Sequence, residues 1–321
     1  MESRATIRIG IALALAAVGC GAAAKGLDKG IERNRVEAPQ ASQHDQLVTA
    51  GDAAWDQRAD RAQLELAIQK WEQAVAIVDS DADTYAKLSR ACYLLADGWL
   101  FFDQKASPGG EAAFLAMHEK GYRLAERGLA ALSPQFEKRR MAGTKIEDAI
   151  KVIGRNGAPL MYWYASNLGK WAKAKGFTTT LEHKDRIFAV ISRVLEVAPD
   201  YFYGAADRYF GAFYSVAPKF AGGDVQKSYE HFQVSLKAAP NYLGTYVLIA
   251  ELYTPLEDAA AGKKPDPAAF DANLDIVLNA KPCPEGGAQS PVPCILPDLA
   301  PEAAIEQKKA RELEARKDEL F

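Results

Sequence analysis

The stretch Leu195–Tyr253 reads LEVAPDYFYGAADRYFGAFYSVAPKFAGGDVQKSYEHFQVSLKAAPNYLGTYVLIAELY and holds one helical unit nearly twice. Two helical patterns end in similar segments, Ala198-Pro199-Asp200-Tyr201 and Ala239-Pro240-Asn241-Tyr242, and a new aromatic-rich helical pattern follows each of them. The segments lie about 41 residues apart, which is close to the length of a helix-turn-helix repeat with a modest insertion. This repetition predicts how the rest of the chain folds.

Each unit carries the residues that end one helix and begin the next. Proline lacks an N–H and disfavours helical geometry in the residue before it, so Pro199 and Pro240 each mark a helix end. Asp200 and Asn241 are expected to cap the helices that follow. Before the first segment, apolar residues recur at the spacing of one helical face, at Ile187, Val190, Ile191, Val194 and Leu195.

A single helical hairpin of this kind leaves its apolar face half covered, so such hairpins must stack. The sequence therefore predicts an all-α chain, a solenoid of helical hairpins that resembles the tetratricopeptide repeat. Alternation of valine, isoleucine and threonine is almost absent, which also favours helices over strands. The net charge of −3 supplies no field that attracts a polyanion, so nucleic acid is not an expected partner.

The N-terminus has the pattern of an export signal. Arg4 and Arg8 supply a positive region before the short apolar run Ile9–Val18, and the run is about half as long as a membrane span requires. Residues 1–19 are therefore predicted to be a signal peptide. The segment Ala17-Val18-Gly19-Cys20 resembles the lipobox of bacterial lipoproteins, in which the cysteine thiol receives diacylglycerol.

We expect a lipid anchor on Cys20, which places the protein in the periplasm of a Gram-negative bacterium and ties it to a membrane. Ala17 stands where a lipobox prefers leucine, so a plain secretory signal or an unprocessed one is the alternative. Gly21 follows the cysteine where an inner-membrane retention signal usually has Asp, and this favours the outer membrane. Residues 20–46 are small and polar with no clean period and are predicted to be a flexible tether.

Residues 47–321 are expected to form the helical domain. The helical pattern begins at Leu47, and a proline-rich loop over 281–301 interrupts it near the end. Pro301 suits the first turn of a terminal helix over 302–320. That helix has few apolar residues, so we expect it to lie across the end of the solenoid as a polar cap.

The four cysteines have different expected roles. With Cys20 lipidated, Cys283 and Cys294 share the proline-rich loop, and export places them in an oxidising compartment, so they are predicted to form a disulfide. Cys92 falls on an apolar helical face and is expected to be a small buried side chain. Neither spacing matches a zinc site.

Aromatic residues exceed what one helical face can bury. Packing between helices is the simpler explanation for any one ring, but together they predict a cavity or pore lined by rings. Asn167 is the polar exception in an apolar helix, either a hydrogen-bonded interior amide or a ligand-facing one. The candidate lining residues are Tyr162, Trp163, Asn167, Trp171, Tyr209, Phe213, Tyr214 and Tyr246.

The sequence lacks the common residue patterns that carry catalysis. No HExxH, P-loop or Gly-x-Ser-x-Gly pattern occurs. Gly222-Gly223-Asp224 is better explained as a tight turn in which Asp224 caps the helix Val225 to Ala238. We therefore expect neither an enzyme nor a metal or other cofactor.

Several short motifs resemble the TatT family, the T components associated with tripartite ATP-independent periplasmic (TRAP) transporters. The similarity covers about residues 47–321, and its most specific part is the Gly-Gly-Asp segment with the His-Phe pair that follows. The motifs are Gly157-Ala158-Pro159, Tyr162-Trp163, Asn167-Leu168-Gly169, Tyr209-Phe210-Gly211, Pro218, Gly222-Gly223-Asp224, Lys227-Ser228, His231-Phe232 and Asp318-Glu319-Leu320-Phe321.

This resemblance implies a helical solenoid of cryptic tetratricopeptide repeats, often a homotrimer, with a pore through each subunit. It also implies pairing with the solute-binding P component of the transporter and passage of an apolar organic ligand to that partner. The alternative hypothesis is a generic envelope scaffold whose concave face binds a peptide or an assembly partner. In that case the aromatic residues are ordinary packing.

Overall fold

The computed structural model describes residues 27, 30–33, 36–104, 106–284 and 293–321. Within these residues the chain is helical, and its extended pairing is limited to two isolated bridges, Asp258 with Lys263 and Pro282 with Ile295. The all-α prediction is confirmed. In chain order the helices are α1 (Ala38–Trp55), α2 (Arg61–Ile77), α3 (Ala82–Leu95), η1 (Ala96–Leu100), α4 (Phe101–Asp103), α5 (Gly110–Leu132), α6 (Pro134–Met141), α7 (Ile146–Ala149), η2 (Ile150–Val152), η3 (Arg155–Gly157), α8 (Ala158–Lys175), α9 (Phe177–Val197), α10 (Tyr201–Val216), η4 (Lys219–Ala221), α11 (Val225–Ala238), α12 (Leu243–Leu248), η5 (Ile249–Tyr253), η6 (Ala259–Ala261), α13 (Pro267–Asn279), η8 (Pro297–Leu299), α14 (Ala300–Ala315) and α15 (Lys317–Leu320).

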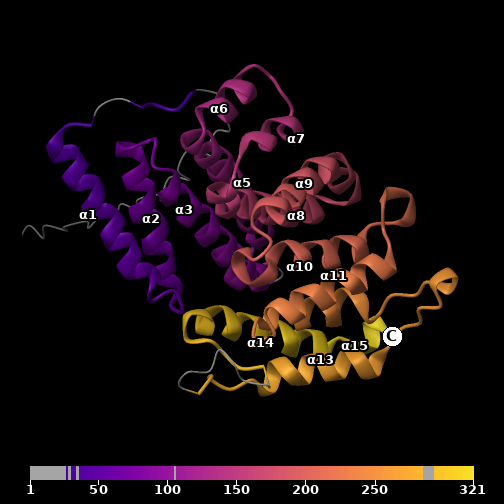
Figure 1. The fold of residues 1–321 in the computed structure, drawn as a ribbon. Helices are drawn as coiled ribbons and strands as arrows, with labels where there is room; N and C mark the ends of the chain where they lie inside the picture. Colours follow the sequence, from indigo (N-terminus) through magenta and orange to yellow (C-terminus); the bar gives the residue numbers. More distant parts are fainter. Residues whose placement is uncertain (1–26, 28–29, 34–35, 105, 285–292) are drawn as a thin grey trace, which may run out of the picture.

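The helices pack mainly against their neighbours in the sequence. α1 packs on α2, α3 on α5, α5 on α8, α8 on α9, and α10 on α11, so the chain forms a succession of adjacent helices (Figure 1). α13 and α14 pack against each other and against α12, and they lie in the lower part of this view. Contacts between sequence neighbours are what a solenoid requires, and the assignment of individual tetratricopeptide repeats stays a prediction.

Aspartate side chains determine where several helices begin. The carboxylates of Asp60 and Asp81 accept backbone N–H groups in the first turns of α2 and α3. Asp224 accepts from the N–H groups of Gln226 and Lys227, so its predicted role at the start of α11 is confirmed.

The predicted caps at Asp200 and Asn241 are wrong. Asp200 makes no capping hydrogen bond to α10, and its carboxylate instead pairs with Arg155 at 2.6 Å. Asn241 accepts the backbone N–H of Cys294 at 3.0 Å and does not cap α12. Both segments bend sharply at these residues, so the side chains meet partners outside the following helix.

The first helix begins at Ala38, inside the range predicted to be a flexible tether. Pro39 occupies the first turn, and low amphipathicity hides this helix from a search for an apolar stripe. Before it, the Ile31 side chain is buried in the core, and Arg33 forms an ion pair with Glu137. Residues 30–33 are therefore attached to the helical body. The predicted signal peptide and the lipidation residue Cys20 lie outside the described residues.

The C-terminal helix is not a polar cap over one end. α14 begins at Ala300 and buries Ala303, Ile305, Ala310 and Leu313, and the chain turns at Arg316 before α15. Gly98 in η1 makes this packing possible, because a Cβ there would lie 2.5 Å from the end of the Ile305 side chain. No helix in the described part of the chain combines the length and hydrophobicity needed to cross a bilayer.

Candidate functional site

A strained turn lies at the start of α10. Phe202, Tyr203 and Gly204 have φ values of 43°, 61° and 68°, which are left-handed conformations. Glycine adopts them easily, but each of the other two residues costs about 1–2 kcal/mol there. The Tyr203 hydroxyl donates to the Asp298 carboxylate at 2.6 Å, and its ring stacks on Tyr242 with centroids 5.6 Å apart. Such strain persists only where surrounding contacts hold it, and it is concentrated at functional sites.

Arg208 lies beneath this turn and is only 3% exposed. Its guanidinium donates to the Tyr203 carbonyl at 2.9 Å, the Phe202 carbonyl at 3.2 Å and the Tyr162 hydroxyl at 3.4 Å. It also lies over the Tyr242 ring, 3.9 Å from the centroid. No carboxylate among the described residues forms an ion pair with Arg208. Its charge is solvated by carbonyl dipoles and ring faces.

Five neighbouring rings from α3, α8, α10 and the start of α12 lie around and beside Arg208, and we call them the aromatic cluster: Tyr93, Tyr162, Trp163, Phe202 and Tyr242. Their centroids are 5.3 Å apart for Tyr93 and Trp163, 5.0 Å for Trp163 and Phe202, and 5.6 Å for Phe202 and Tyr242. Burial raises the pKa values of Tyr93 and Tyr242 well above the usual range. These tyrosines are therefore neutral at physiological pH, and their hydroxyls make no hydrogen bond with described residues.

A set of buried charges borders the aromatic cluster, and α14 supplies several of them. Asp97 lies 2.5 Å from Lys170 and also pairs with Lys309. Burial alone would raise the pKa of Asp97, but the two lysines hold it well below its usual value. Glu302 pairs with Arg58 at 3.0 Å and with Arg90 at 2.9 Å.

A buried polar network joins α3, α5 and α8. The Asn167 amide nitrogen donates to the carbonyls of Trp163 at 2.9 Å and Ser89 at 3.1 Å, and its oxygen lies 2.9 Å from His118 Nδ1. Because those acceptors fix the amide orientation, the His118 proton resides on Nδ1, and Nε2 is buried without a hydrogen-bond partner. Gly121 admits the amide, since a Cβ there would lie 2.5 Å from it. Asn167 is therefore a hydrogen-bonded interior amide in this structure.

His118 makes stability depend on pH. Burial lowers its pKa to about 4, against about 6.5 in the unfolded chain, and the Asn167 hydrogen bond only partly opposes this. Between these values the unfolded chain binds a proton at this histidine and the folded chain does not. The free energy of unfolding therefore falls as pH falls from about 6.5 to about 4, by about 3 kcal/mol in total. His118→Gln removes this loss. Urea unfolding of the wild type and the variant at pH 7 and pH 4.5 measures this loss of stability. An equal loss of unfolding free energy in both proteins would show that His118 is not its source.

The predicted lining residues have different neighbours in the structure. Tyr162 and Trp163 belong to the aromatic cluster. Trp171 packs on Tyr122 and His183, and the Tyr209 hydroxyl approaches Ala165 O at 3.4 Å. Phe213 and Tyr214 pack together, with Tyr214 stacked on His231, and the Tyr246 hydroxyl donates to Pro240 O at 3.1 Å. A continuous pore through all eight residues stays a prediction.

Residue types in the sequence could have revealed what the lining prediction missed. Asp207 and Arg208 are the two charged residues inside a helix that is otherwise mostly aromatic and apolar, and Asp97 lies inside the apolar run that leads to Trp99. A charge at such a position predicts a buried partner or a ligand. Among the described residues no group of three histidine, cysteine or acidic side chains converges, so the structure identifies no metal-binding set there.

A concavity lies apart from the aromatic cluster. It is a groove of ≈ 460 Å³ between α11, η5 and the start of α13, and Tyr229, Leu236 and Tyr253 are among its lining residues. Lys263, Lys264 and Asp266 also line the groove, and it is a candidate for the peptide groove that a scaffold protein would need.

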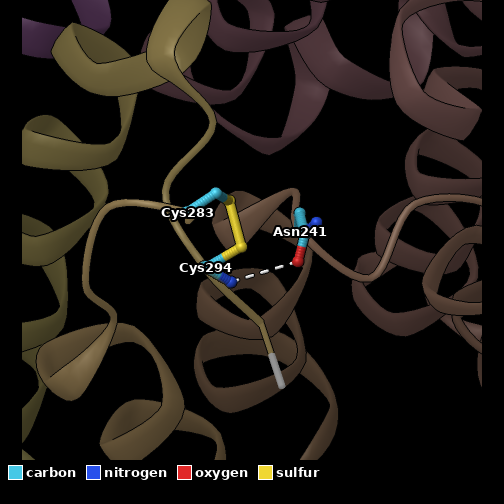
Figure 2. The surroundings of a disulfide bond; sticks show 3 residues. All are labelled: Asn241, Cys283 and Cys294. Carbon is cyan, nitrogen blue, oxygen red and sulfur yellow. Dashed lines mark hydrogen bonds between the residues drawn. A yellow bond between two sulfur atoms is a disulfide. The ribbon is translucent and has the colours of Figure 1, made fainter. Parts of the chain in front are cut away.

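A disulfide joins Cys283 and Cys294, as Figure 2 shows. The backbone N–H of Cys294 donates to Asn241, so the proline-rich loop is held against the segment that precedes α12. Cys92 is free and fully buried, and burial raises the pKa of its thiol to about 12. Cys92 is therefore unreactive in the folded protein.

Loss of the disulfide should lower stability moderately. The bond closes a loop with a sequence separation of 11 residues, which predicts about 2–3 kcal/mol of stabilisation through the unfolded state. Urea unfolding of the oxidised protein with and without dithiothreitol measures the difference. The variant Cys283→Ser with Cys294→Ser should match the reduced protein and ignore the reductant; a wild-type midpoint that is insensitive to reductant would contradict the prediction.

Comparison with known proteins gives one family. The model of the TRAP transporter T-component family matches residues 102–321, which is more than half of the chain. No curated protein matches the sequence significantly. The matched range contains α5, α8, α10, α12 and α14, whereas Tyr93 and Asp97 lie before it.

Proposed function

Since the chain belongs to the TRAP transporter T-component family, we propose that it is a lipid-anchored periplasmic component of a TRAP uptake system that binds the solute-binding P component. In this proposal the aromatic cluster holds a small organic ligand with an apolar body for exchange with that partner. The family is one of transport accessories and not of enzymes. The family match carries the proposal.

The structure supports a ligand-holding role through the aromatic cluster. Its rings come from four separate helical segments, and Arg208 brings a charge to their centre without an ion-pair partner in the described chain. Ligand sites combine apolar and aromatic walls with a few placed polar groups in this way. Strain at Phe202 and Tyr203 adds a second mark of a functional position.

Export and anchoring rest on the sequence before the described residues. The signal-like segment 1–19 and Cys20 support lipidation, and the Cys283–Cys294 disulfide suits an oxidising compartment such as the periplasm. The proposal includes the outer membrane as the site of the anchor and a homotrimer as the assembly. Metabolic labelling with palmitate should mark the wild type, and Cys20→Ser should abolish the label and release the protein from membranes.

Capture of the P component tests the partner. The Cys20→Ser protein, which avoids the lipid, is immobilised and offered the purified P component of a TRAP system from the same organism. Saturable binding in the micromolar range or tighter is expected for a transient accessory complex. A P component from an unrelated TRAP system is the control, and absence of binding by every P component of the organism would overturn this part of the proposal.

The scaffold alternative makes a different prediction for the same protein. A scaffold would bind peptides in the groove between α11 and α13 and would leave the aromatic cluster unaffected. Tyr229→Ala should then reduce partner binding, whereas Tyr242→Phe should not. The opposite outcome supports the aromatic cluster as the functional site.

A further inference from the structure

We infer that the surface formed by α6 and the turn that follows it docks on a phospholipid bilayer that carries anionic headgroups. We call this surface the basic face, and its residues are Lys138, Arg139, Met141 and Lys145. The inference rests on the proposed lipid anchor at Cys20, and it adds the side of the protein that faces the membrane once the anchor is inserted.

An excess of positive charge marks the basic face. Residues 134–145 contain four cationic side chains and one acidic side chain, in a protein whose net charge is −3. Lys138 and Lys145 are exposed and form no ion pair with the residues that the structure describes. Arg139 donates to the backbone carbonyl of Asp148 at 3.3 Å, and the carboxylate of that aspartate is engaged by another lysine. These charges are therefore available to an anionic partner.

The stability of helix ends accounts for only part of this charge. Lys138 and Arg139 lie in the last turn of α6, where the helix dipole favours a cation. Lys145 lies at the N-cap of α7, where the same dipole disfavours a cation. A local structural role therefore does not explain Lys145, whereas a partner outside the chain does.

An exposed apolar side chain lies among these cations. Met141 ends α6 and is 48% exposed, whereas Phe136 of the same helix is fully buried. The buried ring holds α6 on the helical body with Lys138 and Met141 turned to solvent. Surfaces that bind at a bilayer interface combine cations, which attract lipid phosphates, with apolar side chains, which enter the headgroup layer.

The segment that leads to the proposed anchor is fixed beside the basic face. Glu137 of α6 accepts hydrogen bonds from the backbone N–H of Ile31 and from the Arg33 guanidinium, and in Figure 1 the coloured stretch before α1 runs toward α6. Leu27 also packs against the core. Cys20 precedes Leu27 by seven residues, and a chain of that length spans at most about 25 Å. A lipid on Cys20 therefore keeps the α6 side of the protein close to the bilayer.

This short connection favours the bilayer over an acidic protein as the partner of the basic face. The anchor holds the bilayer within reach of these cations at all times, whereas a soluble partner has to diffuse to them. Each lysine or arginine near an anionic surface strengthens binding by roughly fivefold. Three such residues therefore add a second contact to the lipid and fix the orientation of the anchored protein.

Vesicle sedimentation of the Cys20→Ser protein tests the inference in the absence of the lipid. The vesicles contain phosphatidylcholine and phosphatidylglycerol in roughly equal parts, and pure phosphatidylcholine vesicles are the reference. Binding to the anionic vesicles should be at least about tenfold tighter, and salt should weaken it by screening. The triple variant Lys138→Gln, Arg139→Gln and Lys145→Gln should weaken it by about a hundredfold. Met141→Ser should weaken it by about threefold.

A second triple variant is the matched control. Lys264→Gln, Lys281→Gln and Arg311→Gln remove the same number of exposed charges near α13 and α14, in the lower part of Figure 1, whereas α6 lies in the upper part. Because both triple variants have the same net charge, the control should bind anionic vesicles like the parent protein. Equal binding to the two kinds of vesicle, or an equal loss in both triple variants, would overturn the inference.

Two further measurements separate this inference from the proposed function. Palmitate labelling reports the anchor: a labelled wild type whose Cys20→Ser form ignores anionic vesicles would overturn the basic face alone, and an unlabelled wild type would overturn the anchor instead. Capture of the P component reports the partner. If the basic-face variant lost that capture and still bound vesicles like the parent, the face would be a protein-docking surface, and the inference would be overturned.

Discussion

Asp97→Asn should lower the free energy of unfolding by about 3 kcal/mol at neutral pH, because it removes the buried carboxylate that Lys170 and Lys309 share and leaves Lys309 with Glu306 as its remaining ion-pair partner among the described residues. The Asp97 side chain is 6% exposed and lies between Lys170 and Lys309. Lys309 is itself only 14% exposed, so water cannot replace the lost carboxylate there. Urea unfolding followed by tryptophan fluorescence measures the change.

The pH dependence of this effect has a definite sign. The pKa of Asp97 is depressed in the folded protein, so its contribution is complete above the unfolded value of about 4 and shrinks as pH falls below it. The difference between wild type and Asp97→Asn should therefore be constant from pH 7 to about pH 5 and narrow in stronger acid. Asp185→Asn, in which the carboxylate is 83% exposed, is the control and should change stability by less than about 0.5 kcal/mol.

A second variant separates lost charge from lost packing. Asp97→Asn combined with Lys309→Met removes both members of the most buried pair and should recover part of the loss, since the charges left without that partner, Lys170 and Glu306, are the more exposed ones. Full stability of the single variant would show that the ion pairs contribute nothing to folding.

Asn167→Ala should destabilise the protein by a similar amount, about 3 kcal/mol. The substitution leaves the Ser89 carbonyl and the His118 Nδ1–H buried without the amide that joins them. It also opens a cavity beside Gly121, against which the amide packs. Thermal unfolding and urea midpoints report the loss.

The chain offers a close control for this variant. Asn279 also donates its amide to the carbonyl four residues earlier, at 3.0 Å, but on the exposed face of α13. Asn279→Ala should cost less than about 0.5 kcal/mol, because water replaces the hydrogen bond. If the two alanine variants were equally stable, the interior network of Asn167 would not be the source of its effect.

Short sequence patterns predicted the helices and the places where they begin and end, because these depend on neighbouring residues. The spacing of Ile187, Val190 and Val194 and the stops at Pro199 and Pro240 predicted the helices, and Gly-Gly-Asp predicted the start of α11. The resemblance to the transporter family was confirmed by the family match. These features depend on residues within a few positions of one another.

Partners that are distant in the sequence explain what was missed. Asp97 and Lys309 are separated by 212 residues, and Arg58 meets Glu302 across 244 residues, so no local pattern predicts either pair. The left-handed turn at Phe202 and Tyr203 contradicts the propensity of both residues, and only tertiary contacts hold it. Asp200 and Asn241 stand where the sequence suggests helix caps. In the structure the Asp200 carboxylate pairs with Arg155, and Asn241 accepts the backbone N–H of Cys294.

The ion pairs between α14 and the first helices change how the protein should unfold. Stacked hairpins that touch only their neighbours can peel away from either end, one unit at a time. Here Glu302 forms ion pairs with Arg58 and Arg90, and Lys309 forms one with Asp97. Unfolding of the first hairpins therefore also breaks the contacts that hold α14. The first and last helices of the described fold should therefore unfold together, in a single cooperative transition.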